Sequence, residues 1–180
     1  MSILDQLESL DQQLFHSINS LSGTAAIDVV VVAISSHWIW LPVVFLTYFM
    51  VKGHPRAALV MLMAGILVGI SDLLGYQVLK PFFERLRPCH SLEGVQIVKG
   101  CGGKFGFPSN HAMNSASFAY FLLFVTRKAV LSFLLLFAGF VALSRVYLGV
   151  HYPFDILFGH SLGLVLATLS AYLCKKLWKL

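Results

Sequence analysis

The chain has 180 residues, of which 58% are hydrophobic and only 12% are charged, and its mean hydropathy is +0.80. This composition excludes an ordinary soluble domain and indicates an integral membrane protein. The formal net charge of +5 does not indicate nucleic acid as a partner, because no basic groove interleaved with aromatic residues is visible. Apolar segments recur along the whole length, so we expect a single membrane-embedded domain over residues 1–180.

The N-terminal segment, residues 1–26, is predicted to lie on the membrane surface. Apolar side chains recur there at spacings of three and four, and acidic or amide side chains occupy the other positions, which is the pattern of an amphipathic interfacial helix. The apolar positions are Ile3, Leu7, Leu10, Leu14 and Ile18. The segment lacks the basic start of a cleavable signal peptide, so membrane insertion is expected to depend on the spans that follow.

The remaining apolar stretches predict an all-α, polytopic membrane bundle of about five spans. Residues 27–50 are interrupted by Ser35, Ser36 and Pro42, so we expect a short interfacial helix there, followed by a span. Trp38 and Trp40 would anchor that break at the interface. The other predicted spans are residues 57–79, 109–126, 129–143 and 154–174.

Short basic turns predict the orientation of the bundle, because Lys and Arg in short loops stay on the cytoplasmic side. In a five-span arrangement these turns fall on one face, and residues 80–108 and 145–155 lie together on the opposite, extracytoplasmic face. The 80–108 loop is also basic, although the same rule predicts few Lys and Arg residues on the extracytoplasmic face. We therefore expect its charges to bind an anion. The residues of the cytoplasmic turns are Lys52, Arg56, Arg127, Lys128, Lys175, Lys176 and Lys179.

Two of the three cysteines, Cys89 and Cys101, lie in the long loop. An oxidising compartment would permit a disulfide between them, worth roughly 3 kcal/mol in the chain-entropy description, but the sequence leaves that pairing open. Cys174 is expected to be a buried thiol. The spacing of Cys and His residues does not match a zinc site, so no metal is expected.

Three polar clusters lie at the ends of the apolar stretches, where charge is costly unless it pairs or has a function. Pro153 suits the first turn of a helix, so Asp155 is expected one turn beyond His151, close enough to accept a hydrogen bond from the imidazole. A histidine held by a carboxylate is typical of an activated base or nucleophile. The clusters are Lys80-x6-Arg87-Pro88, Pro108-Ser109-Asn110-His111 and Ser144-Arg145-x5-His151-x3-Asp155.

In order and internal spacing these clusters resemble the signature of the type 2 phosphatidic acid phosphatase superfamily, from about Ala57 to the C-terminus. One position departs from that signature, because Asn110 replaces the usual Gly. The resemblance implies a metal-independent phosphatase or diphosphatase, without a cofactor, that forms a phosphohistidine intermediate. It further implies that His151 attacks phosphorus, that Asp155 orients His151, and that His111 protonates the leaving oxygen and later activates water.

The chemistry of phosphoryl transfer agrees with this resemblance. The transferring group spreads negative charge over its oxygens, so catalysis depends on positioning and on charge stabilisation. We assign that stabilisation to Lys80, Arg87 and Arg145. Ser109 and the backbone N–H groups of Asn110 and His111 add a helix N-terminus, which suits an anion.

The expected substrate is an amphiphilic lipid phosphate presented at the outer face of a bacterial cytoplasmic (inner) membrane. Undecaprenyl diphosphate ranks first. Phosphatidylglycerophosphate, phosphatidic acid and lipid A phosphate are the alternatives, since apolar surface discriminates poorly between lipid tails. A rival of another class is an anion or lipid transporter, which would need polar residues near mid-span and inverted repeats. A catalytically silent relative is a third possibility. The sequence gives no information on protein partners.

Several polar residues fall outside the three clusters. We expect Glu84, Arg85 and Lys99 to be solvated loop residues or secondary substrate contacts, and Lys104 to be the best candidate for a supporting contact. Asp72 lies within a predicted span and should be paired, but the sequence does not name its partner. The histidines outside the clusters are expected to be structural: His16, His37, His54, His90 and His160.

Overall fold

The computed structural model describes residues 2–178, and the elements in that range are all helical. This confirms the all-α prediction. Lys179, one of the residues used to predict orientation, lies outside the described residues. In chain order the elements are α1 (Ile3–Asn19), α2 (Ala25–Ile34), η1 (His37–Ile39), α3 (Trp40–Val51), α4 (Ala57–Leu73), η2 (Leu74–Leu79), α5 (Lys80–Phe83), α6 (Pro88–Ser91), α7 (Asn110–Thr126), η3 (Ala129–Ser132), α8 (Phe133–Tyr147) and α9 (Pro153–Trp178).

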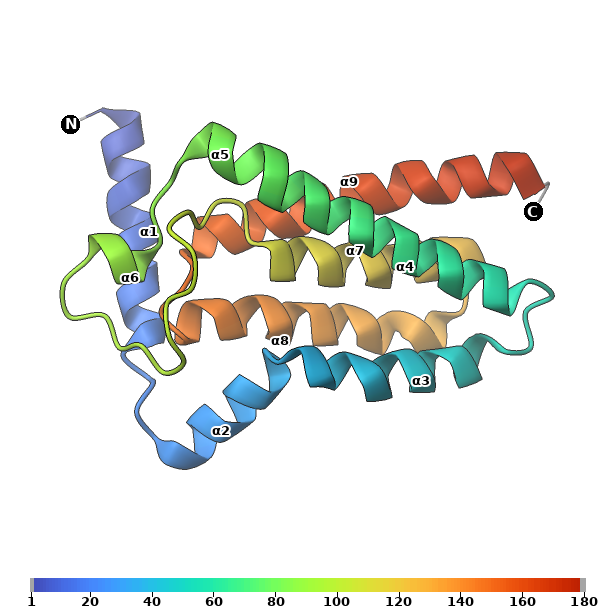
Figure 1. The fold of residues 1–180 in the computed structure, drawn as a ribbon, viewed down its shortest axis with the longest axis horizontal. Coiled ribbons are helices and arrows are strands. Elements are labelled where there is room, and N and C mark those ends of the chain that lie inside the picture. The colour runs from blue at the N-terminus through green and yellow to red at the C-terminus, as the bar shows by residue number, and fades with distance from the viewer. Residues whose placement is uncertain (1, 179–180) are drawn as a thin grey trace.

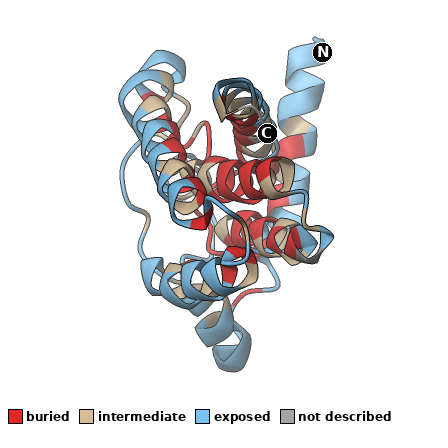
Figure 2. Ribbon diagram, turned by 90° about the vertical axis from the view of Figure 1, so that its right-hand side faces the viewer, coloured by how far each residue is buried: buried red, intermediate tan, exposed pale blue. Residues whose placement is uncertain are grey.

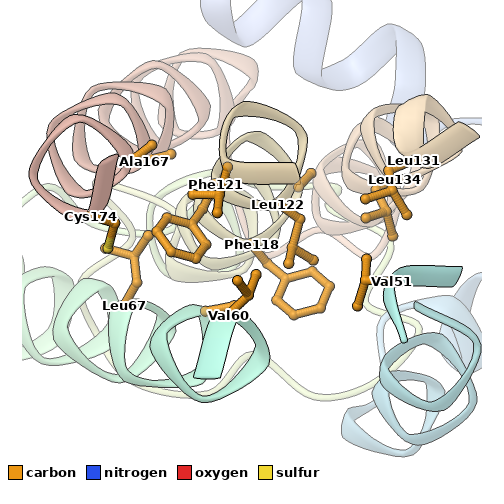
Figure 3. Close-up of a cluster of buried hydrophobic side chains, with 14 of the residues drawn as sticks. Val51, Val60, Leu67, Phe118, Phe121, Leu122, Leu131, Leu134, Ala167 and Cys174 are labelled. Atoms are coloured by element: carbon orange, nitrogen blue, oxygen red, sulfur yellow. The ribbon is translucent and has the colours of Figure 1, made fainter. Parts of the chain in front are cut away.

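Helix α7 forms the centre of the bundle and contacts α4, α8 and α9 (Figure 1). Its sequence is rich in alanine and serine, and small side chains let neighbouring backbones approach closely. The largest hydrophobic cluster joins α7 to side chains from the surrounding helices, including Val60 of α4, Leu134 of α8 and Ala167 of α9 (Figure 3). Buried residues concentrate at this centre, and the outer faces are exposed (Figure 2). Those outer faces are apolar, as lipid contact requires.

Two glycines of α9 allow its close approach to α7. A Cβ at Gly159 would lie 2.6 Å from the carbonyl oxygen of Ser109, and one at Gly163 would lie 2.8 Å from the Cβ of Ala116. Both distances are shorter than van der Waals contact, so a larger residue would force the helices apart. The position of Gly159 matters for the site, because Ser109 precedes the first turn of α7.

We expect Gly163→Val to lower the free energy of unfolding by about 2 kcal/mol, because overpacking displaces α9 from α7. In detergent this corresponds to a fall in melting temperature of roughly 5 °C for a chain of this size. The matched control is Gly65→Val, since a Cβ at Gly65 meets no atom within 4 Å. Equal melting temperatures for the two variants would contradict this account of the interface.

Within residues 2–178, two helices are long and apolar enough to cross a membrane: the continuous helix Ala57–Phe83 and α9. Residues 25–51 form a helix pair bent by 62° that counts as a third span if the pair is taken as one. The predicted break near Ser35 is confirmed, because α2 ends at Ile34 and α3 begins at Trp40. Helix α8 is apolar but shorter. The membrane character is therefore supported, whereas the count of five spans stays a prediction.

Helix α1 lies across one end of the bundle, next to the long loop (Figure 1). A capping box between Ser2 and Asp5 begins the helix, which satisfies two of its free backbone donors. One face exposes leucines and isoleucine, as expected for an interfacial helix, but Asp11 and Phe15 on another face are completely buried. Helix α1 contacts α8 and α9, so it is also part of the folded core.

The 80–108 loop carries a disulfide between Cys89 and Cys101, whose Cα atoms are 6.0 Å apart. The pairing that the sequence left open is therefore formed. Cys174 is a free, buried cysteine, as expected. Although ligand atoms of Cys89, His90 and Cys101 lie within 4.8 Å of one another, the disulfide uses both sulfurs, so this group is not a metal site.

Candidate active site

A cavity of about 600 Å³ opens beside the N-terminal end of α7. Six of the eight predicted site residues line it: Lys80, Arg87, Asn110, His111, Arg145 and His151. They come from α5, the long loop, α7, α8 and the turn before α9, so segments far apart in sequence meet here. Ser109 and Asp155 are completely buried and are not among the lining residues. The hydroxyl of Ser109 has no hydrogen-bond partner within residues 2–178.

His151 lies in the turn between α8 and α9 and is held from both sides. Its Nδ1 is 3.3 Å from Oδ2 of Asp155, and its Nε2 is 3.3 Å from an Arg87 guanidinium nitrogen. Arginine has only donors, so Nε2 accepts and the ring proton belongs on Nδ1, facing the carboxylate. The backbone N–H of Tyr152 also donates to Oδ2 of Asp155, at 2.9 Å. The unprotonated Nε2 of the imidazole is therefore directed toward Arg87.

Burial lowers the pKa of His151 well below its ordinary value of 6.5, and the positive charges of Arg87, Lys80 and Arg145 lower it further. A depressed pKa in a histidine means that the neutral form persists to more acidic pH. At neutral pH the ring is therefore unprotonated on Nε2. This is the protonation state that a nucleophile or a general base requires.

The three predicted phosphate-binding cations have only uncharged hydrogen-bond partners within the described chain. Lys80 donates to the carbonyl oxygens of Gly106 and Pro108 at 3.0 and 2.7 Å. Arg87 donates to the carbonyl oxygen of Gly103 at 2.6 Å as well as to His151.

Arg145 donates to the hydroxyl of Ser35, and its buried Nε has no partner in the described residues. The cavity thus contains three fixed cations with which no carboxylate of the described residues forms a salt bridge. Such an arrangement suits an anion that spreads charge over several oxygens.

His111 lies in the first turn of α7, with its ring centroid 6.1 Å from that of His37. His37 also lines the cavity, so the expectation that it is only structural does not match its position. The rings lie on the cavity wall next to the helix N-terminus, where backbone N–H groups are free to bind an anion. His160 contacts the Tyr120 hydroxyl at 3.2 Å and matches the expected structural role.

The prediction that Arg85 is a solvated loop residue or a substrate contact is wrong. Its guanidinium donates to Oδ1 of Asp155 at 2.6 Å and to Oδ2 of Asp11 at 2.7 Å. Asp11 also accepts from the backbone N–H of Phe154 at 2.9 Å. The only sequence signal was the spacing of Asp11, Phe15 and Asn19 by four residues, which puts all three on one helix face; no local pattern connects that face to the long loop.

Two further residues take positions that the sequence did not specify. The Lys104 side chain is exposed and lies over the Phe105 ring, 5.5 Å from its centroid. It does not line the cavity, so the structure does not support a role for Lys104 in the site. Asp72 does line the cavity, and its partners, which the sequence left unnamed, are the amide groups of Asn110 and Asn114.

The fold and the site together define a helical membrane protein with a cationic cavity around a buried histidine. Residues 54–179 match the PAP2 superfamily, and the chain belongs to this family. The expected family is thus confirmed, and with it the expected class of enzyme, a lipid phosphate hydrolase.

Three relatives show how far the similarity extends. The chain is 34% identical over 170 residues to the lipid A 4′-phosphatase of Bacteroides thetaiotaomicron, covering 89% of this chain and 75% of the relative. It is 28% identical to the undecaprenyl-diphosphatase of Sulfolobus acidocaldarius over 161 residues, covering 88% and 75%. The crystal structure of a transmembrane PAP2-type phosphatidylglycerolphosphate phosphatase from Bacillus subtilis matches with a TM-score of 0.69 and 30% identity, over 95% of this chain and 87% of that one.

Proposed function

We propose that the protein removes a phosphate monoester from a lipid head group, without a metal, through a phosphohistidine intermediate on His151. The observation that carries this proposal is the set of three cations, Lys80, Arg87 and Arg145, that lack carboxylate partners among the described residues and surround an unprotonated imidazole nitrogen. Fixed cations supply the charge stabilisation that a metal ion supplies in other phosphatases.

The first step forms a bond between Nε2 of His151 and phosphorus while the bond from phosphorus to the lipid oxygen breaks. His111 gives that oxygen a proton, so the lipid leaves as an alcohol. Asp155 accepts the Nδ1–H hydrogen bond and stabilises the positive charge that develops on the ring. Lys80, Arg87 and Arg145 hold the phosphoryl oxygens during the transfer.

In the second step His111, now neutral, takes a proton from water, and the water oxygen attacks phosphorus. The bond between Nε2 and phosphorus breaks, inorganic phosphate leaves, and His151 returns to its neutral form. Ser109 and the backbone N–H groups of Asn110 and His111 bind the oxygens at the helix N-terminus. Each residue thus begins and ends the cycle in the same protonation state.

For the substrate, we propose a phosphorylated glycolipid of the lipid A type ahead of undecaprenyl diphosphate, the substrate ranked first from the sequence. Identity to the lipid A 4′-phosphatase is 34%, against 28% to the undecaprenyl-diphosphatase. We place the site on the extracytoplasmic face of a bacterial inner membrane. The basic turns at the other end of the spans support this orientation, and so does the disulfide in the active-site loop, because such bonds persist in oxidising compartments.

The test is phosphate release by protein purified in detergent, with EDTA present, from lipid A, phosphatidylglycerophosphate and undecaprenyl diphosphate. We expect turnover of lipid A at a rate that EDTA does not reduce, because no step needs a metal. Loss of all turnover on chelation, restored by a divalent cation, would contradict the proposal.

A further inference from the structure

Asp72 lies in the same cavity as the cations but at a different depth. It is eight positions, about two helical turns, before Lys80 on the continuous helix Ala57–Phe83. An acid at this level of a membrane helix is costly and usually functional. Its position adds an acidic group to the cavity wall, beside the residues proposed to bind phosphate.

The carboxylate is held in place from α7. The side-chain amides of Asn110 and Asn114 both donate to Oδ1 of Asp72 at 2.9 Å. Asn110 and Asn114 are one turn apart on α7 and both line the cavity. Gly75 makes room for this arrangement, since a Cβ there would lie 2.6 Å from Oδ1 of Asn110.

No cation within residues 2–178 pairs with Asp72, and its Oδ2 accepts no hydrogen bond from them. Asp72 is also exposed. A fixed carboxylate on a cavity wall attracts hydrogen-bond donors and repels a further phosphate. It offers nothing to an apolar chain, since burying a charge against hydrocarbon is unfavourable.

We propose that Asp72, Asn110 and Asn114 form a head-group subsite that binds hydroxyl or amide donors of a sugar or polyol attached to the scissile phosphate. This inference rests on the proposed function, and it names the part of the substrate that the cavity recognises, the hydrogen-bond donors of the head group. It also gives Asn110 a role, because a glycine at that position would remove one of the two amides that orient the carboxylate. Val68 and Trp40 line the same cavity and would contact the apolar surface of the sugar.

The experiment compares kcat/KM for lipid A with kcat/KM for phosphatidic acid, in which all three glycerol oxygens are esterified and no free hydroxyl is available to the subsite. Asp72→Asn is nearly isosteric and keeps an acceptor for the two amides. We expect it to lower the ratio of the two values about tenfold, the effect of weakening one hydrogen bond to a charged group. Asn114→Leu should lower the same ratio at least threefold.

Leu73→Ala is the control, since Leu73 is an exposed neighbour on the same helix and should leave the ratio unchanged. Wild-type ratios in both Asp72→Asn and Asn114→Leu would overturn the subsite. A wild-type protein that releases phosphate from no lipid would instead refute the proposed function, so the two failures are distinguishable.

A different set of contacts lies behind His151 and supports a second inference. Both oxygens of the buried Asp155 are occupied: Oδ2 by His151 and the Tyr152 N–H, and Oδ1 by Arg85 at 2.6 Å. The Arg85 guanidinium also lies over the Tyr152 ring, 4.3 Å from its centroid. Asp155 can therefore turn only if its ion pair with Arg85 breaks.

Helix α1 completes this arrangement through Asp11. One Asp11 oxygen accepts from Arg85 at 2.7 Å, and the other accepts from the Phe154 N–H in the first turn of α9 at 2.9 Å. The half-buried guanidinium is thus shared between two buried carboxylates that are far apart in sequence. Arginine suits this role because its planar fork donates in two directions at once.

We infer that Arg85 is a positioning residue that directs the Asp155 carboxylate at Nδ1 of His151, and that α1 supports it through Asp11. The N-terminal amphipathic helix is then part of the catalytic machinery as well as a membrane contact. Arg85 acts through Asp155 and does not touch the substrate. Its loss should therefore slow the chemical step more than it weakens substrate binding.

We expect Arg85→Ala to lower kcat about 100-fold and to change KM by less than about threefold. Arg85→Lys should restore kcat to within about tenfold of wild type, since an ammonium reaches one of the two carboxylates. Asp11→Asn should lower kcat about tenfold. Lys99→Ala, which removes an exposed cation of the same loop, serves as the control.

A wild-type kcat in folded Arg85→Ala would overturn this inference. A defect confined to KM would also overturn it, and so would a loss in kcat that lysine does not relieve. Melting temperatures measured for all variants separate unfolded protein from slow enzyme, and Arg85→Lys and Asp11→Asn keep the inference testable if Arg85→Ala does not fold.

Discussion

Replacing His151 with alanine is expected to lower kcat at least about 10⁴-fold, because the proposed covalent intermediate has no other acceptor. In the structure the unprotonated Nε2 is held 3.3 Å from an Arg87 nitrogen and Nδ1 3.3 Å from Asp155. Among the described residues that line the cavity, His151 is the histidine whose ring is also held by a carboxylate. The measurement is phosphate release from lipid A in detergent, with the melting temperature of each variant recorded.

The matched control for this prediction is His90→Ala, which removes an exposed imidazole from the active-site loop. We expect it to retain wild-type turnover. A folded His151→Ala protein that keeps more than about one hundredth of wild-type kcat would show that the nucleophile is elsewhere, given the size of such losses in covalent catalysis.

Arg145→Lys is expected to lower kcat/KM about 100-fold, although the substitution keeps the charge. Arg145 lines the cavity, donates to Ser35, and has a buried Nε without a partner in the described chain. A phosphate would give that Nε its missing acceptor, and a lysine cannot reproduce the two-pronged contact. Losing one fixed donor to a developing charge typically costs two to three orders of magnitude in rate.

Arg56→Lys is the control for Arg145→Lys, because it makes the same chemical change at an exposed arginine that contacts the carbonyl oxygen of Trp178. It should leave kcat/KM unchanged. Equal kinetics in the two variants would mean that Arg145 supplies only a point charge or anchors α8.

The local part of the site could be predicted because it depends on short spacings. Pro153 begins α9, which puts Asp155 in its first turn and its carboxylate beside His151. Ser109 is the residue before the first turn of α7, although its hydroxyl makes no capping hydrogen bond. Both results follow from backbone preferences that act over a few residues. The interruption of residues 25–51 was predicted in the same way, from the polar residues at Ser35 and Ser36.

The long-range part of the site could not be predicted, because it depends on how helices pack. Arg85 is 70 residues from Asp155 and 74 from Asp11. No periodicity in the sequence predicts ion pairs between residues so far apart. His37 likewise lies at the break between α2 and α3, and its ring centroid lies 6.1 Å from that of His111, a proximity between segments far apart in sequence that no local pattern predicts. Asp72 was predicted to need a partner. Its partners, the amides of Asn110 and Asn114, could not be predicted because they depend on the packing of α4 against α7.

The substrate was the least predictable feature. The three motif clusters are expected to bind phosphate, which all the candidate lipids share. They therefore do not distinguish one lipid tail or head group from another. The residues proposed to distinguish head groups, Asp72 and Asn114, line the cavity but belong to none of the three clusters.

Trapping the phosphoenzyme tests the central claim most directly. Protein is mixed with lipid A that carries radiolabelled phosphate, quenched in alkali within the first turnover, digested, and analysed for the labelled peptide. The account predicts an alkali-stable, acid-labile label on His151 in the wild type, and none in His151→Ala. A label on His111, or rapid consumption of lipid without any phosphorylated histidine, would contradict it.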